Sequence, residues 1–353
     1  LPGWTAVKLA VVGTGYWGSN HARIAAEFVD EGLVDDAIVC DADPDRARSV
    51  ATEHGLDYVT DHRTIADQGV DAAIVATPSP THEPVVTDLL ADGVHAMVEK
   101  PLALSVDAAN RIVQVADDHD RILGVGHVFR HHPALDAVRE LVRQGELGTV
   151  SHLRTARHAC QPPRPVGALH SLAVHEVDIY RYLLERNPDT VYCRLDRAVA
   201  TDTHDTVSLV LDFGDVTGVV SESWAIPVDG KRRELVVVGS DAVAAVDYLE
   251  DNVVELYDTP PSSQPAGTRQ SHIVESEAPA EVVELDGGEP LKAEDRDFVE
   301  AVQEGREPVT TGVDGTWAVK LLADAERSAE RNAVVDVRGD AMVQPRRSVR
   351  SQN

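Results

Sequence analysis

The sequence has few cysteines and few aromatic residues, and it has no long hydrophobic run. Its three cysteines, Cys40, Cys160 and Cys193, lie far apart and match no spacing of a disulfide framework or a zinc site. No apolar stretch approaches the roughly 20 residues of a membrane span, and residues 1–8 lack the basic and apolar regions of a signal peptide. We therefore expect a cytoplasmic protein with no membrane partner, folded by its own hydrophobic core.

Positive charge is also scarce. The chain has 32 Lys and Arg residues against 60 Asp and Glu residues, a net charge of −28, and only five of the cations are lysines. Nucleic acid is an unsuitable partner, because binding to phosphates requires a basic surface. Repulsion among so many carboxylates is relieved in concentrated salt, where the Debye length becomes short. The composition therefore predicts a halophilic protein.

The first part of the chain alternates short apolar runs with helical patterns. Hydrophobic residues make up 43% of the 353 residues, which is typical of a globular chain with room for two domains. The expected strands are 7–12, 37–40, 72–76, 94–98 and 122–125, and the expected helices are 16–29, 44–54, 80–91 and 106–119. The apolar runs are too uniform for half-exposed antiparallel strands. We predict a doubly wound parallel sheet, a Rossmann domain, over residues 1–127.

The rest of the chain has a different pattern of apolar and polar residues. After an expected helix at 133–144, alternating segments rich in Val, Thr and Leu occur at 150–157, 190–199, 206–213, 217–224, 234–238, 242–246 and 253–257, with a helix at 170–184. They predict a C-terminal α+β domain over 128–338, built on a large, open, mostly antiparallel sheet. Residues 259–289 are expected to form a loop. Two amphipathic helices within 291–332 are expected to pack back toward the first domain, and residues 339–353 to form a polar tail.

A glycine-rich turn directly follows the first apolar run. In this turn, one glycine permits the tight bend, the second lets backbone approach a pyrophosphate, and the third lets helix and strand pack closely. The second expected strand ends at an aspartate whose carboxylate would accept hydrogen bonds from an adenosine ribose. The pattern predicts dinucleotide binding. The residues concerned are Gly13, Thr14, Gly15, Tyr16, Trp17, Gly18 and Asp41.

The same aspartate bears on which dinucleotide binds. A carboxylate at Asp41 would repel the 2′-phosphate of NADP, so NAD is the expected cofactor and NADP the less favoured one. Arg46 lies close enough in the sequence to offer a partner to such a phosphate. Because of Arg46, binding of NADP stays an open alternative.

Two further segments fall at the carboxyl ends of expected parallel strands, where open α/β sheets bind ligands. They are Ala-Thr-Pro-Ser-Pro-Thr-His at 76–82 and Glu-Lys-Pro at 99–101. The alternative is a proline-stiffened loop followed by a turn with a solvated lysine. Because lysine is so rare in this chain, we favour a functional role. The added cofactor contacts are Thr77, Pro78, His82, Glu99 and Lys100.

Taken in order, these motifs resemble those of the glucose-fructose oxidoreductase, inositol dehydrogenase and rhizopine catabolism (Gfo/Idh/MocA) family. Two later segments also match, Gly-His-Val-Phe-Arg-His-His-Pro at 126–133 and His-Glu-Val-Asp-Ile-Tyr-Arg-Tyr-Leu at 175–183, so the resemblance covers nearly the whole chain. It implies a Rossmann domain, a C-terminal α+β domain with a large open sheet, and a nicotinamide cofactor. It also implies a homodimer or homotetramer formed through the C-terminal sheet.

The resemblance implies that Lys100 and His175 form the catalytic pair. Such a site removes a hydroxyl proton while a hydride leaves the same carbon for nicotinamide. Which of the two residues takes the proton stays open, and His175 could instead be satisfied by Asp178 or by backbone. Family members commonly carry an aspartate four residues before this histidine, where this chain has Ser171. Serine can hold a hydroxyl or a water but supplies no charge, so a non-catalytic, NAD-binding regulatory protein is an alternative.

The substrate is expected to be a sugar. Segments around 124–133, 156–164 and 223–235 are similar to enzymes that act on UDP-N-acetylated sugars, whose diphosphate requires cations; Arg157, Arg164, Lys231 and Arg233 are the cations proposed for it. One alternative is a free polyol, inositol or pentose, with the arginines pairing with surface carboxylates instead. Another is transient oxidation by tightly held NAD during elimination or glycoside cleavage. The candidate substrate contacts are Lys100, His127, Arg130, Arg157, Arg164, Ser171 and His175.

A group of histidines raises the possibility of a metal site. It consists of His127, His131, His132 and His158, with Cys160 nearby. The spacing from His127 to His131 would suit one helix face, but Pro133 and the preceding strand argue against a helix there. We therefore expect no metal.

Overall fold

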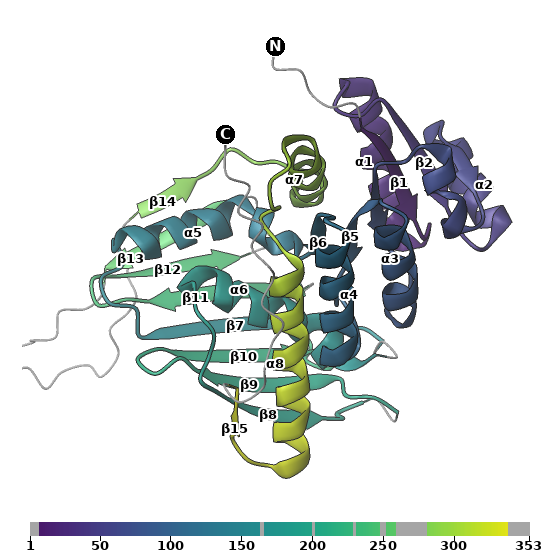
Figure 1. Cartoon of the computed structure of the whole chain (residues 1–353). Helices are drawn as coiled ribbons and strands as arrows, with labels where there is room; N and C mark the ends of the chain where they lie inside the picture. The colour runs from purple at the N-terminus through teal and green to yellow at the C-terminus, as the bar shows by residue number, and fades with distance from the viewer. Residues whose placement is uncertain are drawn as a thin grey trace, which may run out of the picture. The chain divides into compact units, whose positions relative to one another are not determined.

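The computed structural model describes residues 7–162, 166–199, 202–228, 231–247, 252–258 and 281–337 (Figure 1). The chain divides into two compact units. Among the described residues, the first unit holds 7–131 and 288–323, and the second holds 132–287 and 324–337. The first unit is therefore discontinuous in sequence. No helix in the described ranges is both long and apolar enough to cross a membrane.

The first unit is built on a parallel sheet of six strands in the order β3-β2-β1-β4-β5-β6. The strands are β1 (Lys8–Val12), β2 (Asp36–Cys40), β3 (Asp57–Val59), β4 (Ala72–Val75), β5 (His95–Glu99) and β6 (Leu123–Gly126). The order reverses between β1 and β4, which creates the crevice where such sheets bind ligands. The predicted doubly wound Rossmann fold is confirmed. Only the short edge strand β3, which has no apolar run, was not expected.

Helices connect these strands. They are α1 (Tyr16–Glu31), α2 (Pro44–His54), α3 (His82–Ala91) and α4 (Val106–Asp118). Helix α2 begins where the Asp43 carboxylate accepts the N–H groups of Asp45 and Arg46, at 3.0 and 3.2 Å, which satisfies donors that have no partner inside the helix. Helix α3 begins two residues later than expected, because Ser79–Thr81 form a separate 3₁₀ turn.

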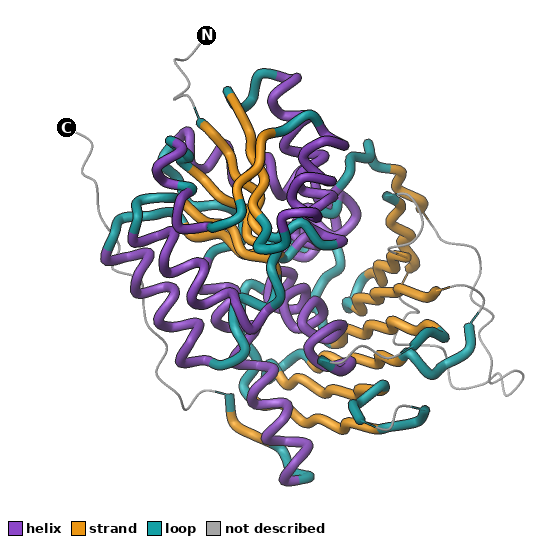
Figure 2. Tube along the Cα trace, turned by 90° about the vertical axis from the view of Figure 1, so that its right-hand side faces the viewer, coloured by secondary structure: helices purple, strands orange, loops and turns teal. Residues whose placement is uncertain are grey.

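Two helices from the end of the chain complete the first unit, namely α7 (Pro290–Glu304) and α8 (Gly312–Arg331), of which residues up to 323 belong to this unit. Phe298 and Val299 of α7 are buried in one core together with Phe28 of α1. Val319 of α8 is buried in the core on the opposite face of the sheet, with α3 and α4. Figure 2 shows helices on both sides of these strands. Both faces of the sheet are thereby covered, as its uniformly apolar strands require.

The second unit is built on nine strands in the order β14-β13-β12-β11-β7-β10-β9-β8-β15. They are β7 (His152–Ala159), β8 (Thr190–Asp196), β9 (Thr206–Asp212), β10 (Thr217–Ser223), β11 (Lys231–Val238), β12 (Ala242–Asp247), β13 (Val253–Asp258), β14 (Glu281–Glu284) and β15 (Val335–Asp336). Every pair is antiparallel except β10 with β7. The predicted large, mostly antiparallel sheet is confirmed. The expectation of a loop throughout 259–289 is wrong at β14, whose two valines pair with β13.

The helices of this unit are α5 (Pro133–Gln144) and α6 (Val174–Leu184). The expected helix at 170–184 is in fact two pieces, because Leu169–Ala173 form a π-helical turn that leads into α6. Tyr180 of α6 lies fully buried against β10, where its hydroxyl donates to the Val219 carbonyl at 2.8 Å and meets the Thr155 hydroxyl at 3.0 Å. These bonds fix the ring, and a Cβ at Gly218 would lie 2.5 Å from it.

We predict that Gly218→Ala destabilises the second unit by about 1–3 kcal/mol, the usual range for overpacking a filled core. The methyl group would collide with the Tyr180 ring, which its two hydrogen bonds hold in place. Thermal melting followed by circular dichroism measures the loss. Gly288→Ala is the matched control, since no atom lies within 4 Å of its Cβ position. Equal melting temperatures for the two variants would contradict the packing argument.

Candidate active site

The turn between β1 and α1 is closed on one side and open on the other. Gly13 has a φ of +89°, and its N–H donates to the Cys40 carbonyl at 2.7 Å. A Cβ at Gly18 would lie 1.7 Å from the Gly13 carbonyl oxygen, so only glycine allows the helix to start this close to the strand. A Cβ at Gly15 would meet no atom within 4 Å. The backbone at Gly15 is therefore open to a ligand.

The amino end of α1 suits a phosphate group. Gly15 caps the helix without a side-chain hydrogen bond, and no acidic residue lies in the first turn. The N–H groups of such a turn carry partial positive charge and bind anions. Tyr16 and Trp17, which are 79% and 42% exposed, lie beside one another with their ring centroids 5.3 Å apart. The predicted glycine residues thus form a cradle that fits a pyrophosphate.

Asp41 follows β2 at the same edge of the sheet. Its Oδ2 accepts the N–H and the hydroxyl of Thr14 at 2.8 and 2.9 Å, and its Oδ1 accepts the N–H of Asp43 at 2.9 Å. Burial acts to raise the pKa of Asp41, but these donors and the Arg46 guanidinium, 3.5 Å away, bring it below its usual value. A carboxylate offers about four acceptor positions, so Oδ1 has room for one further donor such as a ribose hydroxyl. The residues present therefore fit an adenosine ribose.

His82 connects two loops at the carboxyl edge of the sheet. The side chain is buried, and its ring nitrogens lie 2.9 Å from the carbonyl oxygens of Pro101 and Thr77. Thr77 also accepts the Thr81 hydroxyl at 3.0 Å. The ring holds the loop after β4, which includes Pro78, to the loop after β5. Direct contact of His82 with a cofactor stays a prediction.

Lys100 immediately follows β5 and is half-buried. Its N–H donates to Oε2 of Glu99 at 3.1 Å, and the peptide bond to Pro101 is cis. The Glu99 carboxyl lies against β6, where a Cβ at Gly126 would meet it at 3.4 Å. Glycine at this position leaves room for the carboxyl group. The sequence-predicted residues of β1, β2, β4 and β5 thus share the carboxyl edge of one sheet.

The two remaining candidates of the first unit lie just after β6. His127 is buried, and Arg130 is 8% exposed. The Arg130 guanidinium donates to the Asp314 carboxylate at 3.0 Å and to the Val309 carbonyl at 3.4 Å. Arg130 therefore anchors the start of α8, and an anionic substrate group would have to compete with Asp314.

The second unit holds Ser171 and His175, both buried to 8% exposure. Ser171 lies in the π turn and His175 is the second residue of α6, so the regular helical turn expected between them is interrupted. Such π turns are frequent at functional sites. Asp178, three residues further along, is buried with Arg181 at 3.9 Å. Lys100 belongs to the first unit, whereas Ser171 and His175 belong to the second.

Arg157 of β7 lies in a buried cluster of charged groups. Its guanidinium pairs with the Glu176 carboxylate at 2.9 Å, and Glu222 of β10 faces it in the register. Burial raises the pKa of Glu176, and Arg157 offsets part of that rise. The ion pair with Glu176 weighs against the prediction that Arg157 binds a substrate phosphate. Arg164 lies outside the described residues.

Four buried residues of these surroundings were not expected from the sequence: His21, Asp295, Glu176 and Glu222. The sequence carries a partial signal for two of them. Glu222 shares an alternation with Gly218 and Val220 on the covered face of β10. Asp295 lies on the apolar stripe of α7, between Leu291 and Phe298.

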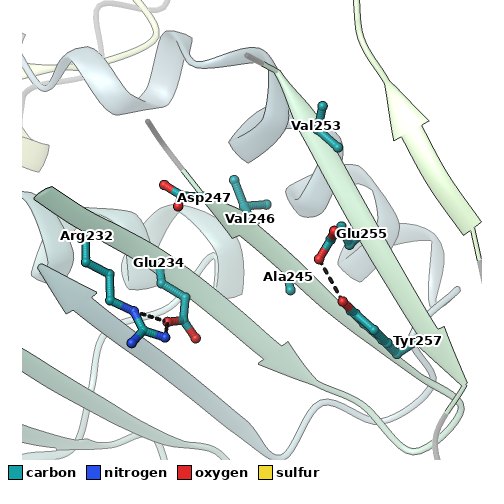
Figure 3. Close-up of a pocket in the computed structure, with 8 residues that line it drawn as sticks. All are labelled: Arg232, Glu234, Ala245, Val246, Asp247, Val253, Glu255 and Tyr257. Carbon is teal, nitrogen blue, oxygen red and sulfur yellow. Dashed lines mark hydrogen bonds and ion pairs between the residues drawn. The ribbon is translucent and has the colours of Figure 1, made fainter. Parts of the chain in front are cut away.

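A shallow hollow on the second sheet contains none of the predicted residues (Figure 3). Arg232 and Glu234 of β11 form an ion pair there, and the Tyr257 hydroxyl donates to Glu255 at 2.7 Å. These polar groups satisfy one another, so the hollow is not a candidate for the chemistry. Among the described residues, no three His, Cys, Asp or Glu side chains gather in a way that could hold a metal ion.

The chain matches two family profiles. Residues 7–127 match "Oxidoreductase family, NAD-binding Rossmann fold", and residues 135–245 match "GFO/IDH/MocA C-terminal domain". These two ranges coincide with the parallel sheet and with most of the open sheet. The profiles therefore confirm the resemblance drawn from the motifs.

Known proteins resemble the chain over nearly its full length. Inositol 2-dehydrogenase of Rhizobium meliloti is 25% identical over 94% of this chain and 99% of its own. UDP-N-acetylglucosamine 3-dehydrogenase of Acidithiobacillus ferrooxidans is 27% identical over 88% of this chain and 93% of its own. The crystal structure of GenD2 from gentamicin A biosynthesis, in complex with NAD, has a TM-score of 0.77 and 27% identity over 95% of this chain and 99% of that one. The chain belongs to the GFO/IDH/MocA family of NAD-dependent oxidoreductases.

Proposed function

We propose that this oxidoreductase oxidises a secondary hydroxyl of a UDP-N-acetylated hexose by hydride transfer to NAD. The observation that supports this most is the shared edge of the parallel sheet. The open turn at Gly15, the ribose acceptor Asp41 and the half-buried Lys100 all follow carboxyl ends of its strands. Oxidation of a CH–OH group needs a cofactor and a proton-handling side chain held together in this way.

The roles of the side chains follow from what the reaction moves. Bound NAD would accept the hydride, and the chain itself must remove a proton from the hydroxyl and stabilise the charge that develops on its oxygen. Lys100 can donate a hydrogen bond to that oxygen. His175 suits the proton acceptor, because the unperturbed pKa of an imidazole lies near neutral pH. Ser171 can hold a substrate hydroxyl or a water, but it adds no charge.

A second candidate substrate is a free polyol such as an inositol. The similarity to UDP-N-acetylglucosamine 3-dehydrogenase supports the nucleotide sugar, whereas the similarity to inositol 2-dehydrogenase supports the polyol. One structural observation favours the polyol. Arg157, one of the cations expected at a diphosphate, lies in a buried ion pair with Glu176.

We also propose that the protein works in the cytoplasm of a halophile as a homodimer or homotetramer. The net charge of −28 supports the high-salt environment. The face of β11 that carries Arg232 and Glu234, opposite to buried Leu235 and Val237, supports an oligomer contact through the open sheet.

We attribute the preference for NAD to Asp41, because its carboxylate would accept the ribose hydroxyls of NAD and repel a 2′-phosphate. We predict that Asp41→Ala lowers the ratio of kcat/KM with NAD to kcat/KM with NADP about tenfold or more, because the negative charge that repels a 2′-phosphate is gone. Steady-state kinetics with both cofactors measure the ratio. Asp45→Ala is the control, since Asp45 lies 91% exposed and pairs only loosely with Arg48. An unchanged ratio in Asp41→Ala would remove this residue from cofactor choice.

The substrate prediction is tested by reduced-nicotinamide absorbance in molar potassium chloride. We expect NADH formation with UDP-N-acetylated hexoses and none with free hexoses, pentoses or inositols, because only the former carry the diphosphate. NADH from a free polyol alone would replace the nucleotide sugar by the polyol and would leave Lys100 and His175 in place.

The catalytic pair is tested by Lys100→Met and His175→Ala. Each change should lower kcat by about 10²- to 10⁴-fold, the usual contribution of proton transfer by a positioned side chain. The Kd for NAD, followed by fluorescence, should stay within about threefold, since cofactor binding rests on the Gly13–Gly18 turn. Lys8→Met and His119→Ala, on the surface of the first unit, are the matched controls. Near-normal turnover in both active-site variants would refute the assignment.

A further inference from the structure

Three titratable groups, Asp295, His21 and Glu99, form a line that leads to Lys100 in the first unit. His21 of α1 is fully buried, and its Nδ1 lies 2.8 and 2.9 Å from the two carboxylate oxygens of Asp295, which α7 brings in from the end of the chain. Its Nε2 lies 3.3 Å from Oε1 of Glu99. The other oxygen of Glu99 accepts the main-chain N–H of Lys100 at 3.1 Å, and the positive charge of the Lys100 side chain also acts on Glu99. The line therefore runs from Asp295 through His21 and Glu99 to Lys100.

The geometry fixes the protonation of His21. An ionised carboxylate only accepts hydrogen bonds, and a neutral imidazole has only one N–H to donate. Because both ring nitrogens face carboxylates, both bonds form only when the ring carries two protons. Burial would lower the pKa of His21, but Asp295 and Glu99 together raise it well above its usual value. We take His21 as the imidazolium and Asp295 as the carboxylate: burial raises the pKa of Asp295, and the positive charge and the hydrogen bond of His21 act against that rise.

This positive charge acts on Glu99, whose side chain is 12% exposed. Burial favours a protonated carboxyl group, yet the hydrogen bond from His21, its charge and the charge of Lys100 lower the pKa of Glu99 below the usual value. Two other titratable groups lie near the line: the charge of Glu289 acts on Asp295, and the charge of Glu99 acts on His82. Glu289 is negative, and burial lowers the pKa of His82 below its usual value, so neither takes the place of His21 beside Glu99.

We propose that His21 and Asp295 are positioning residues that keep Glu99 ionised beside Lys100 and thereby keep Lys100 protonated. The charges along the line alternate in sign, so each group stabilises the next. The catalytic consequence rests on the proposed function: Lys100 is then the hydrogen-bond donor to the substrate oxygen, and His175 is left as the proton acceptor. Glu99, in the first unit, thus supplies the negative charge that Ser171 cannot supply.

The protonation of Lys100 can be followed directly, without substrate. The chain has five lysines, Lys8, Lys100, Lys231, Lys292 and Lys320, so ¹³Cε-lysine NMR of the full chain gives a small set of signals, and Lys100→Arg identifies the signal of interest. In His21→Gln the two buried carboxyls lose their positive partner, and Glu99 takes up a proton. We expect the midpoint of the Lys100 titration to fall by about one pH unit.

Two further variants separate this effect from a general disturbance. Glu99→Gln should lower the Lys100 midpoint by a similar amount, and adding His21→Gln to it should change nothing more, because His21 acts through Glu99. His62→Gln is the matched control, since the ring of His62 pairs with Asp88 in an exposed position of the same unit. It should leave the Lys100 titration unchanged.

The proposal is overturned if the Lys100 midpoint stays where it is in His21→Gln, or if the effects of His21→Gln and Glu99→Gln add in the double variant. Should His21→Gln fail to fold, as judged by circular dichroism and NAD binding, Asp295→Asn carries the test. Asp295→Asn removes the negative charge that stabilises the proton on His21. It should therefore lower the Lys100 midpoint as well, by a smaller amount than His21→Gln. An unchanged Lys100 midpoint in Asp295→Asn would overturn the proposal.

The pH dependence of kcat then separates this proposal from the proposed function. If Lys100 is the donor, the alkaline limb of the kcat profile of His21→Gln moves down by the same amount as the NMR midpoint. A shift of the NMR midpoint without a shift of the kcat profile would support the charge line and would refute the catalytic role of Lys100.

Discussion

The parallel pairing of six strands is the constraint on which the candidate site depends. Parallel strands end at one edge, so every loop that follows a strand meets the others there, whatever its place in the sequence. Gly15, Asp41, Thr77 and Lys100 come together for this reason alone. The buried sheet also requires apolar residues on both faces, which leaves its carboxyl edge as the place where polar side chains gather at low cost.

Much of this arrangement is readable from the sequence, because it depends on local patterns. The glycine turn, the end of β2 at Cys40 and the Glu-Lys-Pro segment after β5 follow from apolar runs, period and turn chemistry. The two-part fold follows from the change between uniform and alternating strands. Short edge strands such as β3 and β14 escape notice, because three or four residues paired on one side carry almost no pattern of their own.

The buried ionic contacts could not be predicted. Asp295 is 274 residues from His21 along the chain. The sequence around neither residue contains a pattern that would predict their contact. Likewise, Arg157 was expected at a substrate phosphate, but it pairs with Glu176, which belongs to α6. A charged residue in an apolar stripe shows that a partner must exist. It does not show which one, because that depends on tertiary packing.

The discontinuity of the first unit also bears on how the chain is made. A ribosome releases residues 7–131 long before α7, yet Phe298 fills the core beside Phe28, and Asp295 provides the carboxylate that the buried His21 requires. During synthesis the Rossmann sheet must therefore wait, with one face uncovered and His21 without the Asp295 carboxylate, while residues 132–287 of the second unit emerge. Domains usually complete themselves in the order of synthesis. Here the first unit begins first but is completed only after most of the second unit has been made, so its uncovered face is exposed to chaperones and proteases during that interval.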